Sequence, residues 1–364
     1  MARPFVATPD DPALAELCQR LRERSADLDL RGDWPAEQLQ LCGEYGVFAW
    51  FADQAWGGLA WDQPGIVAGY RAVASACLTT TFVITQREGA CRRIETSDND
   101  EVKAELLPGL TRGDLLATVG ISHLTTSRRH VGRPVLQARR TADGFVLDGF
   151  SAWVTGAAHA DYVVVGAVVM EGDQPTDQQI IAVVPTRLAG VRAEPPARLV
   201  ALSASHTGQF TLDGVHLPKR WVLVGPVENA LARGVGAGTG GLQTSTLAVG
   251  LARAALHFLT DEARRRADLA PPAAALEADY RRIDELLMAA ARGEPSCSTD
   301  DLRQQANTLV LRCTQAALAA AKGAGFVAGH PAGRWCREAL FFLVWSCPQP
   351  VVAAHLCELA GILD

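Results

Sequence analysis

The chain has 364 residues, of which 48% are hydrophobic and 20% charged, with a formal net charge of −6. This length and composition predict a large globular unit of two or three subdomains with a substantial core. The negative charge argues against nucleic acid as a partner, because phosphate binding needs a concentrated basic face, and no apolar run approaches the roughly 20 residues of a membrane span.

The first 115 residues have the pattern of packed helices. Apolar residues recur at helical spacing from residue 11 to about 30, and a proline near residue 35 opens a second helical segment. A third segment, Pro64 through Thr85, is apolar nearly all round, so we expect one buried helix there. Residues 1–115 are therefore expected to form an all-α domain.

Short strands are predicted between residues 116 and 223. Alternating or β-branched runs such as GFVLDGFSAWVT and ADYVVVGAVVM occur there, with Asp-Gly turn signals at 143–144 and 213–214. From residue 224 helical spacing returns in three long segments. This order excludes a doubly wound sheet, in which strands and helices alternate. We expect an α+β chain with a middle β-barrel domain at 116–223 and a C-terminal four-helix bundle at 224–364.

The cysteines and the N-terminus indicate the compartment. Nine cysteines lie far apart, without a C-x-x-C pair or regular spacing. This pattern is typical of buried, reduced thiols and predicts neither disulfides nor a metal site. Because the N-terminus also lacks the basic and apolar regions of a cleavable signal, we expect a cytoplasmic protein.

One C-terminal segment, FVAGHPAGRWCREALFFLVWSCP, carries the most specific pattern. It resembles the acyl-CoA dehydrogenases, which have a glycine-rich turn, Tyr-Pro, Arg-Asp-Ala and an aromatic residue before Glu-Gly-Thr. The shared framework is Gly323, Gly325, Phe326, Pro331, Arg337, Ala339, Phe342 and Trp345. Four earlier segments resemble the family in the same order: VFAWFADQAWGGLAWD, ELLPGLTRGDLLATVGIS, GFVLDGFSAWVTGAAHADYVVV and SHTGQFTLDGVHLPKRWVL. The resemblance covers essentially the whole chain and implies the same three-part fold.

The resemblance implies an enzyme that contains flavin adenine dinucleotide (FAD). In that family a carboxylate removes the α-proton of an acyl thioester while the flavin accepts the β-hydride. Trp153, Val154 and Thr155 correspond to the Trp-Ile-Thr that lies against the flavin ring. The preceding flavin strand corresponds to Thr118 through Ser127. Within it, Ile121 replaces a flavin-binding threonine, and Ser127 keeps a hydroxyl that the family often uses for flavin or substrate.

The ADP half of the site departs from the family pattern. Arg266 stands where the family has a pyrophosphate contact, and Gly323 belongs to the glycine-rich turn. Lys322 replaces one glycine of that turn, and Ala319 replaces its glutamine. Pro348 replaces a threonine and lacks both a hydroxyl and an amide proton. FMN, or no flavin at all, therefore stays an alternative to FAD.

The family's catalytic base has no counterpart in this chain. Ser346 occupies its usual position, next to the pocket residue Trp345, and a serine is not a carboxylate base. A subset of the family carries the base on the first C-terminal helix, where this chain has the substrate-pocket residues Gly240 and Gly241. His123, in the flavin strand, is the alternative candidate because histidine titrates near neutrality.

Three functions remain open from the sequence. The first is a flavin-dependent oxidoreductase that acts on an acyl thioester with a relocated or absent base. The second is a flavin monooxygenase of the same fold, which uses reduced flavin and oxygen and needs no base for an α-proton. The third is a non-catalytic paralogue that serves as a binding or assembly module. For all three the resemblance implies a homodimer or homotetramer.

Overall fold

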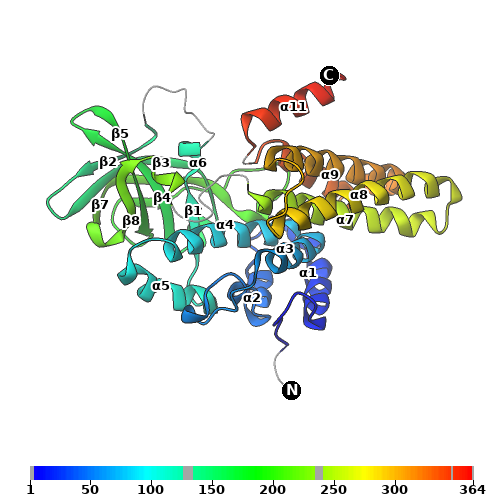
Figure 1. Ribbon diagram of the computed structural model, residues 1–364, viewed down its shortest axis with the longest axis horizontal. Helices are drawn as coiled ribbons and strands as arrows, with labels where there is room; N and C mark the ends of the chain where they lie inside the picture. Colours follow the sequence, from blue (N-terminus) through cyan, green and yellow to red (C-terminus); the bar gives the residue numbers. More distant parts are fainter. Residues whose placement is uncertain (1–3, 126–133, 234–240, 346, 363–364) are drawn as a thin grey trace.

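The computed structural model describes residues 4–125, 134–233, 241–345 and 347–362. Three candidate site residues, Ser127, Gly240 and Ser346, lie outside the described residues. The order of elements along the chain is helical, then β, then helical (Figure 1). Within the described residues, no helix combines the length and the hydropathy needed to cross a membrane.

In the described part of the chain, five α-helices precede the sheet: α1 (Pro12–Arg31), α2 (Ala36–Glu44), α3 (Gln63–Ala76), α4 (Leu78–Glu95) and α5 (Asp100–Arg112). α1 begins at Asp11, whose carboxylate accepts from the Ala13 amide, and ends at Gly32 with a φ of 70°. α4 lies at the centre, because it packs against α3, α5, α7 and strand β1. Twelve of its residues are buried, which explains its apolar character nearly all round.

The single helix expected from Pro64 through Thr85 is wrong, because the structure has two helices there. α3 ends at Ala76, and Cys77 adopts an extended conformation with φ −153° and ψ 103°. The Thr80 hydroxyl donates to the Cys77 sulfur at 3.2 Å and supports the start of α4. Neither glycine nor proline marks this break, so the usual sequence signal for it is missing.

The β part of the described chain is one eight-stranded sheet. Its strands are β1 (Ala117–Gly120), β2 (Leu136–Arg140), β3 (Gly144–Thr155), β4 (Tyr162–Glu171), β5 (Gln174–Pro185), β6 (Val191–Ala193), β7 (Thr207–Pro218) and β8 (Val222–Glu228). They are ordered β6-β7-β3-β2-β4-β5-β8, and β1 pairs in parallel with β4. The short helix α6 (Ser122–Thr125) follows β1. β4 is buried on both faces over most of its length, so it forms the middle of this core.

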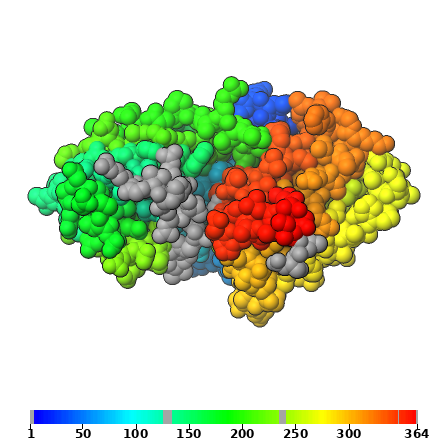
Figure 2. Space-filling view, turned by 90° about the horizontal axis from the view of Figure 1, so that it is seen from above, coloured from blue at the N-terminus to red at the C-terminus, as the bar shows by residue number. Residues whose placement is uncertain are grey.

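The C-terminal part is built around α7 (Leu242–Ala263), which packs against α3, α8 (Ala270–Ala291) and α9 (Thr299–Ala321). α10 (Pro331–Ala339) and α11 (Gln349–Leu359) pack on α9. Figure 2 shows α11, in red, on the surface of the molecule. The fold class predicted from the sequence is confirmed by this arrangement. The domain limits at 115/116 and 223/224 stay predictions, and strand β8 runs past the second of them.

Candidate functional site

Strand β3 presents a tryptophan to the surface at the predicted flavin-ring wall. Trp153 is 51% exposed, whereas Val154 and Thr155 are buried. The pairing of β3 with β7 shifts register between Ser151 and Val154, and such a bulge turns a side chain out of the regular alternation. An indole exposed in this way offers an open aromatic face for stacking.

Strand β1 lies directly against this end of β3. A Cβ on Gly120 would come within 3.0 Å of Val154 Cγ2 and 3.3 Å of Ser151 Oγ, so glycine permits the close approach. Thr118 is on the same face of β1, because side chains alternate along a strand. The hydroxyls of Thr118 and Ser151 are buried and have no hydrogen-bond partner among the described residues. Ile121, at the end of β1, is half-buried.

The hydroxyl expected near the flavin is already bonded within the protein. Thr155 Oγ1 lies 2.9 Å from Thr207 Oγ1, which lies 2.8 Å from Ser205 Oγ. This chain of hydroxyls ties the end of β3 to β7. Thr155 therefore supports the position of the neighbouring Trp153 through the backbone of β3.

His123, on α6, is buried and bonded to the sheet. Its Nε2 lies 2.7 Å from the carbonyl oxygen of Gly166, so Nε2 carries the proton and donates it. Nδ1 is then the lone-pair nitrogen, and it is buried without a partner among the described residues. Burial lowers the pKa of His123. The ring is thus kept neutral, and its role as a base stays a prediction.

An aromatic cluster packs around the turn that leads to Ser346, the predicted base position. Phe341 and Trp345 stack with centroids 4.9 Å apart, and Phe82 on α4 meets Trp345 edge-on at 5.1 Å. The next residue, Ser346, is outside the described part of the chain. The contact nevertheless places α4 beside the segment that precedes Ser346.

Two buried polar residues of α9 anchor the same turn, and sequence reasoning missed both. Arg303 is 1% exposed and donates to the carbonyl of Trp345 at 2.7 Å. Asn307, one turn later, donates to the carbonyl of Phe342 at 2.9 Å. Burial lowers the pKa of Arg303 to about 10. Their only sequence signal is that two polar residues four apart share the buried face of a helix.

The ADP-side candidates lie at the ends of α7 and α9. Arg266 Nη1 donates to the carbonyl of Ala320 at 2.7 Å, and the guanidinium lies 3.8 Å from Glu262 and 3.7 Å from Asp268. The guanidinium of Arg266 thus already has hydrogen-bond and ion-pair partners within the chain. Gly323 is exposed, with open space where a Cβ would point.

Two further site residues start helical segments. Lys322 has φ 53° and ψ −147°, a conformation that strongly favours glycine. Gly241 caps α7 and likewise faces open space.

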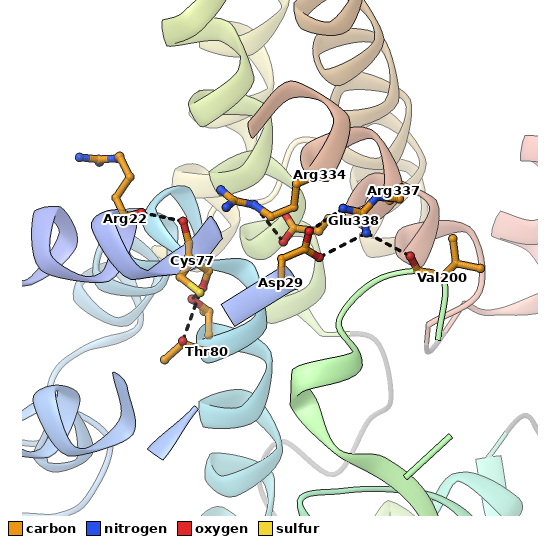
Figure 3. Close-up of polar contacts among 10 residues, drawn as sticks. Arg22, Asp29, Cys77, Thr80, Val200, Arg334, Arg337 and Glu338 are labelled. Atoms are coloured by element: carbon orange, nitrogen blue, oxygen red, sulfur yellow. Dashed lines mark hydrogen bonds and ion pairs between the residues drawn. The ribbon is translucent and has the colours of Figure 1, made fainter. Parts of the chain in front are cut away.

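Four charged side chains point toward one another where α1 meets α10: Asp29, Arg334, Arg337 and Glu338 (Figure 3). Arg337 holds Asp29 through both guanidinium nitrogens, at 2.5 and 3.3 Å. Arg334 and Glu338 are buried and lie 3.6 Å apart. Burial raises the pKa of Glu338 to about 7, although Arg334 opposes the shift.

A second buried acid lies on α4. Glu88 is 5% exposed, and burial raises its pKa to about 8 against the opposing charges of Arg92 and Arg87. Arg87 is engaged elsewhere, because it donates to the carbonyl of Leu110 and lies over the ring of Phe48 at 4.0 Å. Desolvation therefore outweighs the neighbouring positive charge.

Comparisons with known proteins identify what the chain is similar to. The family model described as "Acyl-CoA dehydrogenase, N-terminal domain" matches residues 13–114. A probable acyl-CoA dehydrogenase of Bacillus subtilis is 24% identical over 72% of this chain and 69% of its own length. The structure of butyryl-CoA dehydrogenase from Megasphaera elsdenii matches with a TM-score of 0.80 and 16% identity, over 96% of this chain and 97% of that one. A dibenzothiophene monooxygenase from Paenibacillus, also solved with FMN and indole, matches with a TM-score of 0.72 and 18% identity, over 90% and 91%.

Proposed function

Because the chain belongs to the acyl-CoA dehydrogenase family, we propose that it is a flavin-dependent oxidoreductase that acts on an acyl thioester. The observation that carries the proposal is the half-exposed indole of Trp153, at the position where the family has a flavin-stacking tryptophan. A large aromatic side chain exposed to this extent is suited to stack on a planar ring.

The residues on the ring side fit an isoalloxazine. Trp153 would cover one face of the ring, while the unpartnered hydroxyls of Thr118 and Ser151 lie on the neighbouring strands. Buried polar groups without partners are rare in proteins and often mark a site that is completed by another molecule. A bound flavin would accept a hydride or electrons from the substrate, which no side chain of the chain can do.

The ADP side fits less closely, and this bears on the type of flavin. Arg266 and Gly323 are the residues we propose for the pyrophosphate of FAD, but Arg266 already has three partners in the chain. Pro348 has no amide proton to donate. FMN, which lacks the ADP half, is therefore the alternative cofactor.

We propose the turn from Phe342 to Trp345 as the other wall of the site, because it leads to Ser346, the predicted base position. Arg303 and Asn307 donate to the carbonyls of this turn. Ser346 itself carries no carboxylate. Loss of a general base commonly costs about 10² to 10⁴ in rate. We therefore propose that proton abstraction is slow, with the neutral His123 as the candidate acceptor.

A flavin monooxygenase is the second candidate function. It is favoured by the missing carboxylate, since such an enzyme does not remove an α-proton, and by the similarity to the Paenibacillus monooxygenase. The two candidates differ in one assay. An acyl-CoA dehydrogenase activity reduces bound flavin anaerobically with an acyl thioester, whereas a monooxygenase forms an oxygenated product only when reduced flavin, oxygen and its substrate are all supplied.

The decisive experiment is the visible spectrum of the purified protein, followed by titration with FAD and FMN. We expect flavin binding that Trp153→Ala weakens at least about fivefold, because an aromatic stack contributes roughly 1 kcal/mol beyond buried area. Trp153→Phe should recover most of the affinity. The matched control is Phe5→Ala, which removes another exposed ring. A colourless protein that binds neither flavin would refute the proposal and leave only the non-catalytic module.

We also propose that the chain forms a homodimer or homotetramer. Several large apolar side chains of the C-terminal part are exposed, among them Phe326 at 88%, Val327 at 65% and Val344 at 77%. Exposed apolar groups of this kind are typical of surfaces that another subunit covers. Light scattering coupled to size exclusion gives the assembly state directly.

A further inference from the structure

A cavity of about 390 Å³ lies where the end of α4 meets β8 and the 3-10 turn η6 (Ala230–Ala232). This volume is within the range of small-molecule sites, roughly 300 to 1,000 Å³. One wall is polar and consists of Arg93, Thr96, Ser97 and Asp98. The opposite wall presents the half-buried side chains of Val224, Val227 and Leu231, with the buried Ile181 and Leu223 behind them, while Arg233 lies at the exposed edge.

The guanidinium of Arg93 lacks a counter-ion in this cavity. Its Nη1 donates to the carbonyl of Gly89 at 2.8 Å. No carboxylate of the described residues lies within 4.0 Å of it, in contrast to Arg253, which has Glu277 at 3.0 Å. Burial and the adjacent Arg92 lower the pKa of Arg93. A partly buried cation without a partner costs free energy, and an anion brought from outside would offset that cost.

The charges around the cavity indicate how much negative charge it accepts. Arg93 and Arg233 contribute two positive charges and Asp98 one negative charge, which leaves a net charge of about +1. The Thr96 and Ser97 hydroxyls donate to the carbonyls of Arg92 and Ile94, and Ser97 also accepts from the Asn99 amide, so neither hydroxyl has a proton left to donate to an anion. A monoanion balances this set, whereas a phosphate dianion would leave an excess negative charge near Asp98.

The cavity is separate from the candidate ring site. Phe82 of α4 contacts Trp345, next to the family's base position. Arg93 is eleven residues further along the same helix, which corresponds to roughly 16 Å. Arg93 also approaches the side of β1 that carries Val119, whereas the adjacent Gly120 faces Ser151 and Val154.

We propose that this cavity binds a small amphipathic carboxylate, with its carboxylate on the Arg93 guanidinium and its short hydrocarbon part against β8 and η6. A guanidinium matches a carboxylate because two parallel N–H donors reach both oxygens. Contact with Val224 and Val227 of β8 and Leu231 of η6 would remove part of the hydrocarbon from water. Binding at this site is independent of the flavin and of the proposed reaction.

The test uses sodium hexanoate as the probe, with binding followed by saturation-transfer NMR and by the shift in melting temperature. We expect wild-type protein to bind hexanoate and Arg93→Met to weaken that binding at least tenfold, since hydrogen bonds to charged groups are among the stronger ones. Arg233→Gln, at the cavity edge, should weaken binding by a smaller factor. The matched control is Arg112→Met, which removes an arginine from the last turn of α5 and leaves the cavity intact.

Two further probes define the ligand class. Hexanol has the same chain without the charge, and inorganic phosphate has the charge without the chain, so we expect neither to compete with hexanoate. Equal hexanoate affinity of wild type and Arg93→Met would overturn the proposal, as would no binding of hexanoate at about 10 mM, which corresponds to a binding free energy of about −2.7 kcal/mol. Phosphate binding that depends on Arg93 while hexanoate fails would overturn the assignment to a carboxylate.

Discussion

Replacing Glu88 by glutamine is expected to remove a pH dependence from the stability of the fold. Burial raises the pKa of Glu88 from 4.5 to about 8, so the native protein holds a proton there that the unfolded chain has released at neutral pH. A raised native pKa contributes stability that is fully present below pH 4.5 and is lost as the pH rises through about 8. Glutamine has the same shape as the protonated acid and does not titrate.

The magnitude follows from the two pKa values. Where the native state is protonated and the unfolded state is not, the free energy of unfolding falls by about 1.4 kcal/mol per pH unit. Between pH 5.5 and 7.5 this amounts to about 2.5 kcal/mol, because native Glu88 begins to ionise at the upper end. Glu338 gives a slope of the same sign in both proteins, so it cancels in the difference.

Urea unfolding at several pH values between 5.5 and 7.5 measures the effect as the difference in unfolding free energy between wild type and Glu88→Gln. As the pH rises, the unfolding free energy of the variant should increase steadily relative to that of wild type. Glu23→Gln, at an exposed position on α1, is the control and should track wild type throughout. Parallel curves for Glu88→Gln and wild type would refute the reasoning, because they would mean that Glu88 is already ionised in the native state.

Three other predictions follow from particular contacts. Lys322→Gly should raise the melting temperature, corresponding to about 1 kcal/mol, whereas Lys322→Ala should not, because the φ of 53° favours glycine alone. Burial lowers the pKa of His355, so its contribution to stability is present above pH 6.5 and lost as the pH falls. The protection factors of the α11 amides, which correct for the slower intrinsic exchange at low pH, should therefore fall more below pH 6 in wild type than in His355→Gln. Asp29→Asn should cost about 1 kcal/mol by urea unfolding, since Arg337 is 42% exposed and solvent screens the pair, and added salt should shrink the difference.

The fold could be predicted from the sequence because the spacing of hydrophobic residues determines the helices and strands. Strand β4 (Tyr162–Glu171) is a nearly continuous apolar run rich in valine and is buried on both faces over most of its length. The break between α3 and α4 could not be predicted from the sequence. It depends on Cys77 being held extended where α3 and α4 meet, and residues 76–78 contain neither glycine nor proline.

The candidate site could be predicted from the sequence only in part. Trp153 could be singled out by its resemblance to a known motif, but its exposure results from a register shift between β3 and β7 that no local pattern signals. Arg303, Glu88 and Glu338 were not predicted, because what makes each important is burial among partners from distant segments. An arginine on a helix is expected at the surface. Arg303 is instead buried, and its Nη2 donates to the carbonyl of Trp345 while its Nε donates to Asn307 Oδ1.

At Lys322 the backbone has a conformation typical of glycine although the side chain is that of lysine. Its conformation, with φ 53° and ψ −147°, is one that glycine adopts readily, and the family has a glycine at this position. The turn after α9 therefore keeps its shape even though a lysine occupies it, at a cost of order 1 to 3 kcal/mol. A similar separation of backbone and side chain is predicted at the turn from Phe342 to Trp345. Arg303 and Asn307 bond to its carbonyls, and the following residue, Ser346, is the predicted base position and has no carboxylate. On this proposal the chain is better suited to placing a ring and a ligand side by side than to fast proton abstraction, so flavin binding must be measured before turnover.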